Sequence, residues 1–367
     1  MSMADKPAIR AEGQRLLDAF RAAGAVPVEA DILQPAEALL DLYGEDIRAR
    51  AYVTADPLRG EMMLRPDFTV PVVQMHMAGG AEPARYAYLG EVFRRQERLG
   101  ARASEYLQAG FELFDRADPP AADAEVFACI HGALAPLGLR AVTGDIGILA
   151  DAVRGLSTTE RRKAALMRHI WRPGRFRKLL DRFGGRAAPD PRRAELIDRL
   201  AADTPEALIA AAGPLIGKRA ADEIAARCAA LVEDAAEPAI PAPEVATVEA
   251  ILSLRAKAPA ALEALRGHAA AMPALAPAVA RLEARHAALA ARGVDVAALD
   301  FEAAYGRTTM EYYDGFVFGL LAGDDMPPVA TGGRYDALTA VLGQGRAIPA
   351  VGGVIRPGLV AALGGLR

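Results

Sequence analysis

The chain has 367 residues, 52% of them hydrophobic, which is long enough for two or three domains and a sizeable core. Its net charge of −4 gives no bulk electrostatic reason to expect nucleic-acid binding, although a local basic patch is compatible with it. The N-terminus has early charges and no long apolar run, so we expect no signal peptide, no membrane span and a cytoplasmic protein. Cys129 and Cys228 form no CxxC pair, and the motifs GxGxxG and HExxH are absent. We therefore expect no disulfide, no metal and no cofactor.

Hydrophobic periodicity predicts alternating helices and strands in the first part of the chain. Leu16, Leu17 and Phe20 at helical spacing indicate an amphipathic helix, and the turn residues of "ADPLRG" separate two short strands. In chain order we expect a helix over 8–23, a strand entering a short helix over 32–43, strands over 50–54 and 60–64, a helix over 69–77, strands over 86–95 and 104–114, a helix over 122–135 and a strand over 138–149.

The composition changes after Ser157 to Ala, Leu and Arg with few β-branched residues, which predicts a series of helices. Strand patterns return in the last part of the chain, where the double glycines are interpreted as tight turns. Because neighbouring strands in the first part have hairpin spacing, we expect an α+β fold with an antiparallel sheet. The expected division is a first core segment at 1–155, a helical insertion at 156–292 and the remainder of the core at 293–367.

Two alternating strands, "YAYLGEVFRR" and "SEYLQAGFELF", carry the polar side chains of the candidate site. In the second strand Gln108, Gly110 and Glu112 share one face, and apolar residues form the other. If the strands pair as a hairpin, Arg94 can lie beside Gln108 and Glu112. A carboxylate, an amide and a guanidinium around a glycine suit a zwitterionic ligand. The alternative is the solvent-facing polar side of a half-exposed sheet.

Three further stretches carry candidate residues. "LRPDFTVP" places Asp67 and Thr69 before a helix, where N-capping is the alternative role. "EYYDGFVFGLL" places Tyr312 and Tyr313 on opposite faces of a strand, and "TGGRYDAL" places Tyr335 after a glycine turn. Packing is the alternative role for each of these tyrosines.

Five motifs occur in the order found in the catalytic domain of histidyl-tRNA synthetase, a class II aminoacyl-tRNA synthetase. They are "LRPDFTVP", "GEVFRR…EYLQAGFELF", "YYDGFVF", "GGRYDAL" and "AVGGVI". The resemblance implies a six-stranded, mostly antiparallel sheet flanked by helices, with a helical insertion. Proteins of this family are usually dimeric. It also implies a histidine site with Asp67, Thr69, Gln108 and Glu112 at the ammonium, Arg94 at the carboxylate, and Tyr313 and Tyr335 beside the imidazole.

The chain departs from the synthetases at residues that serve ATP and the reacting carboxylate. Thr308 stands where the synthetase strand has an Arg, and Arg307 is one position away. Leu359 stands where the last motif has its ATP-binding Arg, with Arg356 nearby, and Gln96 replaces the usual Glu. Losing one charge donor at a transition state costs on the order of 10²–10³ in rate. We also expect no anticodon-binding domain and no tRNA partner.

An amino-acid site kept beside altered ATP residues resembles the ATP phosphoribosyltransferase regulatory subunit family, whose members are paralogues of histidyl-tRNA synthetase. The resemblance implies a non-catalytic, homodimeric subunit in a hetero-oligomer with the short-form catalytic subunit. It implies a requirement for activity in the first step of histidine biosynthesis and feedback inhibition by L-histidine. Two alternatives stay open: a minimal synthetase-like enzyme that uses Arg94, Arg307 and Arg356 to activate an amino acid, and a free-standing amino-acid sensor.

Overall fold

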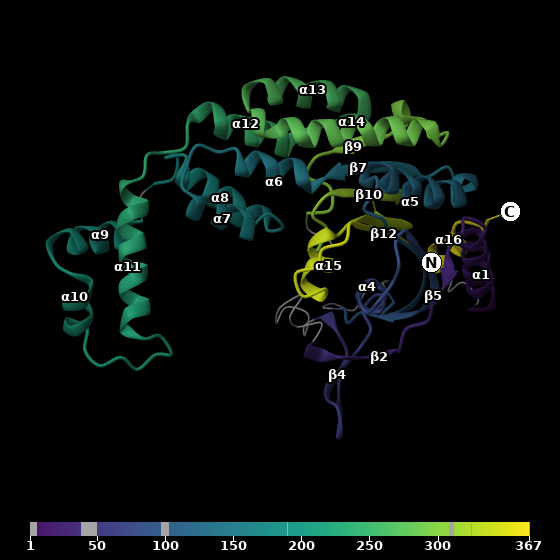
Figure 1. The fold of residues 1–367 in the computed structure, drawn as a ribbon, viewed down its shortest axis with the longest axis horizontal. Helices are drawn as coiled ribbons and strands as arrows, with labels where there is room; N and C mark the ends of the chain where they lie inside the picture. Colours follow the sequence, from purple (N-terminus) through teal and green to yellow (C-terminus); the bar gives the residue numbers. More distant parts are fainter. Residues whose placement is uncertain are drawn as a thin grey trace. The chain divides into compact units, whose positions relative to one another are not determined.

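The computed structural model describes residues 6–37, 50–96, 103–188, 190–307, 312–323 and 325–366, and it divides the chain into two compact units (Figure 1). The first unit contains Met1–Leu149 and Ile251–Arg367, and the second contains Ala150–Ala250. The second unit is shorter than the predicted insertion, because two helices that follow residue 250 pack with the first unit.

The first unit is built on a nine-stranded mixed sheet in the order β1-β5-β6-β12-β11-β10-β7-β9-β8. Its strands are β1 Val26–Pro27, β5 Ala84–Phe93, β6 Glu105–Phe114, β7 Arg140–Asp145, β8 Arg255–Lys257, β9 Asp300–Glu302, β10 Phe316–Leu321, β11 Ala330–Arg334 and β12 Ala350–Ile355. The prediction of a six-stranded, mostly antiparallel sheet is therefore wrong in the number of strands. The six central strands, from β5 to β7, are antiparallel, but β1 and β9 add parallel pairs at the edges. The three extra strands have two or three residues each, too few for an alternation pattern to show.

A smaller sheet in the same unit has the order β2-β4-β3. Its strands are β2 Leu33–Pro35, β3 Val53–Asp56 and β4 Gly60–Leu64. The predicted strand pair around "ADPLRG" is thus confirmed. The turn is held by Asp56, whose carboxylate accepts the backbone N–H groups of Leu58 and Arg59 at 2.8 and 3.0 Å.

Helices pack against both faces of the large sheet. In the first unit they are α1 Lys6–Ala22, α4 Thr69–Met77, α5 Pro119–Ala133, α13 Ala258–Ala271, α14 Ala276–Ala291, α15 Asp336–Leu342 and α16 Pro357–Ala362. On one face, the Phe20 ring of α1 lies 5.7 Å from Phe111 of β6, and α5 contacts β6 and its neighbour β12. On the other face, Phe68 at the start of α4 stacks on Tyr88 of β5 at 4.3 Å. The candidate polar residues therefore lie between the sheet and α4.

The double glycines lie inside strands, so their interpretation as tight turns is wrong. Gly332 and Gly333 of β11 pair with Gly353 and Gly352 of β12. A Cβ at Gly332 would lie 2.3 Å from the Phe318 ring, so this glycine leaves room for a core aromatic. Glycine inside a strand marks such a close approach as well as a turn.

The second unit is helical, as predicted for this part of the chain. Its helices are α7 Glu160–Arg168, α8 Pro173–Phe183, α9 Pro191–Ala202, α10 Pro205–Ala211 and α11 Ala221–Ala236, while α6 Ile146–Arg154 and α12 Ala242–Ser253 span the unit boundaries. The strand predicted over 138–149 ends at Asp145, whose side chain accepts the Gly147 N–H at 2.8 Å as α6 begins. No helix within the described ranges has the length and apolar character needed to cross a bilayer.

Candidate functional site

The polar face of β6 is buried. β5 and β6 form the predicted antiparallel hairpin, in which Tyr88 lies opposite Gly110 and Tyr86 opposite Glu112. The exposed fraction of Gln108 is 0% and that of Glu112 is 1%. The alternative of a solvent-facing polar side is therefore excluded, and these polar groups need partners because burial removes their water.

Glu112 accepts hydrogen bonds from three hydroxyl groups on three different segments. The Tyr335 hydroxyl donates to Oε2 at 2.5 Å, and those of Tyr88 and Thr69 donate to Oε1 at 2.9 and 3.2 Å. All three donors are neutral. An ionised carboxylate offers about four lone-pair sites, so Glu112 can accept one more donor.

Two glycines give this cluster its space. A Cβ at Gly352, which lies opposite Glu112 on β12, would come within 1.4 Å of the Glu112 carboxylate. A Cβ at Gly110 would lie 2.1 Å from the Tyr88 ring. The space that Gly110 leaves is thus filled by Tyr88, and larger residues at either glycine would displace the cluster.

Asp67 and Thr69 take part in the site and do not cap α4. The N-cap residue is Phe68, and no side chain caps the helix there. Thr69 directs its hydroxyl to Glu112, and Asp67, 5% exposed, lies close enough to influence the ionisation of Glu112. Neither residue therefore holds the N-cap position of α4.

The ionisation of Glu112 reflects this mixture of burial and hydrogen bonding. Burial raises the pKa of Glu112 to about 7, although the hydroxyl donors lower it, and Asp67 raises it further. Burial also raises the pKa of Tyr88 and of Tyr335 well above the usual range, so both phenols stay protonated donors. A buried carboxyl group such as Glu112, whose described hydrogen-bond donors are all neutral, would be stabilised by a cation.

Gln108 is a buried amide with unmet hydrogen-bonding capacity. Neither its Oε1 nor its Nε2 has a partner in the part of the chain that the structure describes. Leaving a buried donor or acceptor unpaired costs about 1–3 kcal/mol, so such groups need a specific explanation. Gln108 shares its strand face with Glu112, and a polar ligand beside both would supply the missing partners.

A cationic end of the site lies near Tyr313. Tyr313 is 6% exposed, and its pKa is raised by burial and by Glu112, while Arg94 lowers it. The Arg94 Nε donates to the Pro66 carbonyl at 2.8 Å. Burial lowers the pKa of Arg356, and Arg94 lies close enough to lower it further. Tyr313 therefore lies within electrostatic reach of both the carboxylates and the guanidiniums.

The structure brings the predicted site residues together in three places. Asp67, Thr69, Glu112 and Tyr335 form the carboxylate cluster, and Tyr313 and Arg94 lie at the cationic end. Gln108 lies four residues before Glu112 on the same face of β6. The hairpin register places Tyr86, not Arg94, opposite Glu112, and Arg94 follows the last strand pair. Thr308 lies outside the described residues.

Sequence analysis missed Tyr88 as a site residue. Tyr88 is fully buried, stacks on Phe68 and donates to Glu112. A signal was present in the alternation, because Tyr88 lies across the hairpin from a glycine. Placing Tyr88 opposite Gly110 requires the register of the β5–β6 hairpin. The alternation of polar and apolar residues does not give that register.

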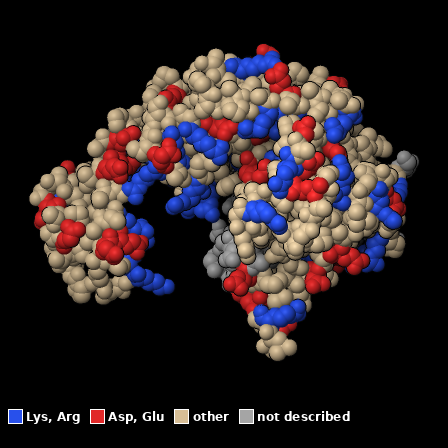
Figure 2. All heavy atoms as spheres, in the orientation of Figure 1, with Lys and Arg blue, Asp and Glu red and all other residues tan. Residues whose placement is uncertain are grey.

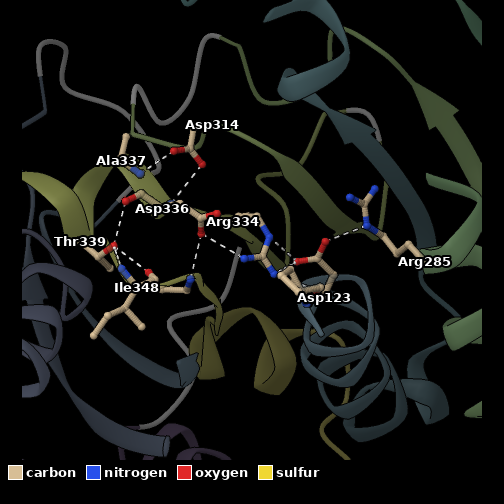
Figure 3. Close-up of polar contacts among 10 residues, drawn as sticks. Asp123, Arg285, Asp314, Arg334, Asp336, Ala337, Thr339 and Ile348 are labelled. Carbon is tan, nitrogen blue, oxygen red and sulfur yellow. Dashed lines mark hydrogen bonds and ion pairs between the residues drawn. The ribbon is translucent and has the colours of Figure 1, made fainter. Parts of the chain in front are cut away.

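A buried network of ion pairs supports the segment that carries Tyr335 (Figure 3). Arg334 donates to Asp123 at 2.7 and 2.9 Å and to Asp336 at 3.0 Å. Arg285 donates to the other Asp123 oxygen at 2.8 Å, linking α14 to α5. Because Tyr335 lies between Arg334 and Asp336 in the chain, the network holds the backbone from which Tyr335 reaches Glu112. The sequence carries no signal for it, since Asp123 and Arg334 are 211 residues apart.

Comparisons with known proteins agree with this architecture. The family model for histidyl-tRNA synthetase matches residues 4–242 and 228–357. A curated protein from Brucella anthropi, named ATP phosphoribosyltransferase regulatory subunit, is 34% identical over 343 residues, covering 89% of each chain. The protein of the same name from Brucella canis is 34% identical over 355 residues, again covering 89% of each chain. This chain belongs to the ATP phosphoribosyltransferase regulatory subunit family.

The fold of this ATP phosphoribosyltransferase regulatory subunit family member is also seen in a solved structure. A Bacillus halodurans C protein, described as an ATP phosphoribosyltransferase regulatory subunit/histidyl-tRNA synthetase, superposes with a TM-score of 0.66 at 20% identity. The match covers 97% of this chain and 79% of that one. The synthetase-like fold is therefore confirmed, and the curated names indicate a regulatory subunit and not a synthetase.

Proposed function

We propose that the chain is the non-catalytic subunit that assembles with a short-form ATP phosphoribosyltransferase catalytic subunit. In this role it is required for activity in the first step of histidine biosynthesis and transmits feedback inhibition by L-histidine. We propose that it works in the cytoplasm as a homodimer within the hetero-oligomer and does not use tRNA. Membership of the regulatory subunit family supports the assembly, and the Glu112 site supports the effector.

The observation that carries the effector proposal is the buried Glu112 carboxyl, to which the described residues donate only neutral hydroxyls. On the same strand face lies the Gln108 amide, whose polar atoms have no partner among the described residues. The α-ammonium of histidine would neutralise the charge of Glu112 and Asp67 and would reach the remaining lone pair of Glu112. Gln108 would complete that end, and Thr69 would hold Glu112 in place. Arg94 would bind the carboxylate of the ligand. Tyr313 and Tyr335 would border its imidazole.

Histidine at this position would act on several elements at once. The Glu112 cluster joins β5, β6, α4 and the residue that precedes α15. A ligand can shift a conformational equilibrium only through different affinities for its two states, and such coupling is typically worth about 1–3 kcal/mol. A cluster that ties four segments together offers contacts that can differ between states.

The proposal is tested by adding the chain to a purified short-form catalytic subunit. We expect the two to co-purify, the transferase rate to rise, and histidine to lower that rate. The Glu112→Gln variant should still activate the catalytic subunit but should lose the response to histidine. Failure of the parent chain both to associate and to change the rate would rule out the proposed function.

One observation favours a second candidate, an amino-acid-activating enzyme. Arg94 and Arg356 near Tyr313 could bind an anion such as a phosphate or an acyl phosphate. Histidine-dependent exchange of pyrophosphate into ATP measures this activity directly, and we expect none. Exchange that scales with protein concentration and disappears in Glu112→Gln would favour the enzyme instead.

A further inference from the structure

A strongly basic segment lies in the second unit, although the chain as a whole is acidic. Between Arg161 and Lys178 there are eight Lys and Arg residues and no Asp or Glu, against 43 basic and 47 acidic residues in the whole chain. The segment contains most of α7, the following turn and the first half of α8. Figure 2 shows basic side chains gathered at the position of these two helices.

Some cations of this segment have structural partners. The Arg162 Nε binds the Asp234 carboxylate at 2.6 Å, and another of its nitrogens donates to a backbone carbonyl. Lys163 pairs with Glu160 at 2.9 Å. The Arg162 contacts hold α7 against α11 Ala221–Ala236, and the Lys163 pair lies within α7, so both charges already have partners in the protein.

Three of the remaining cations are exposed and form no ion pair with any residue in the described ranges: Arg168, Arg175 and Lys178. We call them the α7–α8 basic face. Arg177 is also exposed, but it lies within electrostatic reach of Glu249. Arg175 and Lys178 are neighbours on the surface of α8, three residues apart. Arg168 lies in the last turn of α7. Beyond the effect of burial, Arg175 and Arg168 both lower the pKa of His169, so both guanidiniums lie near this one imidazole.

The α7–α8 basic face has a stable support. The two helices bury Leu166, Phe176, Leu180 and Phe183 within the second unit. The cations are therefore displayed from packed helices and need little ordering when a partner binds, which favours recognition. Like charges held together on a surface repel one another, and an anionic partner relieves that repulsion.

A compact acidic protein surface fits this face better than a nucleic acid. The positive charge is local, because Ala150–Ala250 as a whole contains 17 basic and 15 acidic residues. An extended phosphate backbone needs a row of cations, since each neutralised phosphate contributes separately to affinity. Beyond this segment, the same unit would present many carboxylates to such a backbone. A small acidic patch on a protein can contact the α7–α8 basic face without approaching those carboxylates.

We infer that the α7–α8 basic face is the surface on which an acidic patch of the catalytic subunit docks. The inference rests on the proposed function and assigns to it a partner-binding surface. Complementary charges steer two proteins together and raise their association rate by about 10–10³-fold, an effect that falls with salt. The second unit would thus recognise the partner while the Glu112 site in the first unit holds the effector.

The test compares two triple charge reversals in the full-length chain. One carries Arg168→Glu, Arg175→Glu and Lys178→Glu. The matched control carries Arg192→Glu, Arg199→Glu and Lys218→Glu, three cations that are exposed in the same unit. Association with the catalytic subunit is followed by stopped-flow fluorescence at low and at physiological salt. We expect the first variant to associate at least about tenfold more slowly and to lose most of the salt dependence, while the control behaves as the parent.

The remaining outcomes separate the two proposals. If the parent chain associates and the first variant matches it in rate and salt dependence, the docking inference is overturned and the proposed function stands. If the parent chain does not associate at all, the docking inference and the proposed function are both wrong. If the first variant keeps its association but loses binding to a short labelled RNA that the parent binds, the face is a nucleic-acid surface.

Far-ultraviolet circular dichroism and thermal unfolding confirm that both variants fold. Glutamine at the same three positions removes the charge without reversing it and gives an intermediate test.

Discussion

The first unit contains two buried clusters of charged side chains, and they differ in how their charge is balanced. In the cluster of Figure 3, Asp123 lies between the guanidiniums of Arg285 and Arg334, with distances of 2.7 to 2.9 Å. In the Glu112 cluster, the described residues donate only neutral hydroxyls to the carboxylate, and Asp67 lies within its electrostatic reach. Both oxygens of Asp123 thus have guanidinium partners, whereas within the described residues no cation contacts the Glu112 carboxylate.

This difference separates a structural role from a binding role. Buried ions persist when they are paired and hydrogen-bonded, and removing one partner leaves an uncompensated charge. A buried carboxylate that already has guanidinium partners is not stabilised further by a cationic ligand. A cluster whose carboxyl has its pKa raised to about 7 by burial gains from any cation that fits. Substitutions in each cluster test this difference.

The largest effect is expected from Arg285→Met. This change keeps most of the side-chain volume but leaves Asp145 without its 2.8 Å ion pair and Asp123 with Arg334 alone. Breaking a buried pair from one side costs about 3–5 kcal/mol, so chemical denaturation should show a loss of that size in the free energy of unfolding. The control is Arg266→Met, because Arg266 pairs with Glu283 at an exposed site and such pairs are worth about 0–1 kcal/mol. Equal effects of the two changes would contradict the assignment of a structural network.

The next effect is expected from Glu112→Gln, and its largest part should appear in histidine binding. Losing one partner of a buried charge pair costs about 2–5 kcal/mol, which corresponds to a loss of histidine affinity of roughly 30-fold or more by calorimetry. The matched control is Glu125→Gln, since Glu125 pairs with Arg85 on the other side of the sheet, at 2.5 and 3.0 Å. The control should keep the parent affinity. A Glu112→Gln protein that binds histidine as tightly as the parent would remove this residue from the site.

The same substitution has a definite effect on stability as pH changes. In the native state the pKa of Glu112 is raised from 4.5 to about 7. The unfolded chain therefore ionises first, and this group contributes a loss of stability as pH rises from about 4.5 to 7. Glu112→Gln removes that loss, so the melting temperature of the variant relative to the parent should be higher at pH 8 than at pH 4.5.

The contrast between the clusters also shows what the sequence could predict. The β5–β6 hairpin, the pair β3–β4 and α4 follow from alternation, turn residues and helical spacing, which are local patterns. The polar face of β6 could be found in the same way. Its burial could not, because it depends on α4 and on Tyr335, which lies 223 residues from Glu112. The Figure 3 network likewise joins α5, α14 and β11, and no local pattern encodes such pairing.

Glycine is the clearest case of a signal that needs the fold. From the sequence, the pair at 352–353 suggests a turn, whereas Gly352 lies within β12 and makes room for Glu112. Four residues that the resemblance assigns to the histidine site, Asp67, Thr69, Glu112 and Tyr335, lie together in the structure. The resemblance gave no reason to expect the close contact between Gly352 and Glu112, because that contact depends on the register between β12 and β6.

A smaller effect is expected from Gln108→Met. The substitution removes a buried amide without partners among the described residues, so it should raise the free energy of unfolding by about 1 kcal/mol, while histidine binding weakens. Thr339→Val is the contrasting control, because the Thr339 hydroxyl is buried and satisfied: it donates to the Ile348 carbonyl at 2.7 Å and accepts from the Ile348 N–H at 3.0 Å. The control should lose about 1–3 kcal/mol and keep its affinity. If Gln108→Met lost stability as Thr339→Val does, Gln108 would be a structural residue.

The smallest effect is a fraction of a proton exchanged on binding. With a pKa of about 7, Glu112 is partly protonated in the free protein at pH 7. An ammonium group favours the ionised form and lowers the pKa, so histidine binding should release up to one proton and should tighten as pH rises from 6.5 to 8. Calorimetry in buffers of different ionisation enthalpy measures this release. The Glu112→Gln protein supplies the baseline, because any proton that histidine itself exchanges remains in that variant. Equal proton release in both proteins would mean that the ammonium is bound elsewhere, and the Glu112 cluster would then be unbalanced for a reason other than this ligand.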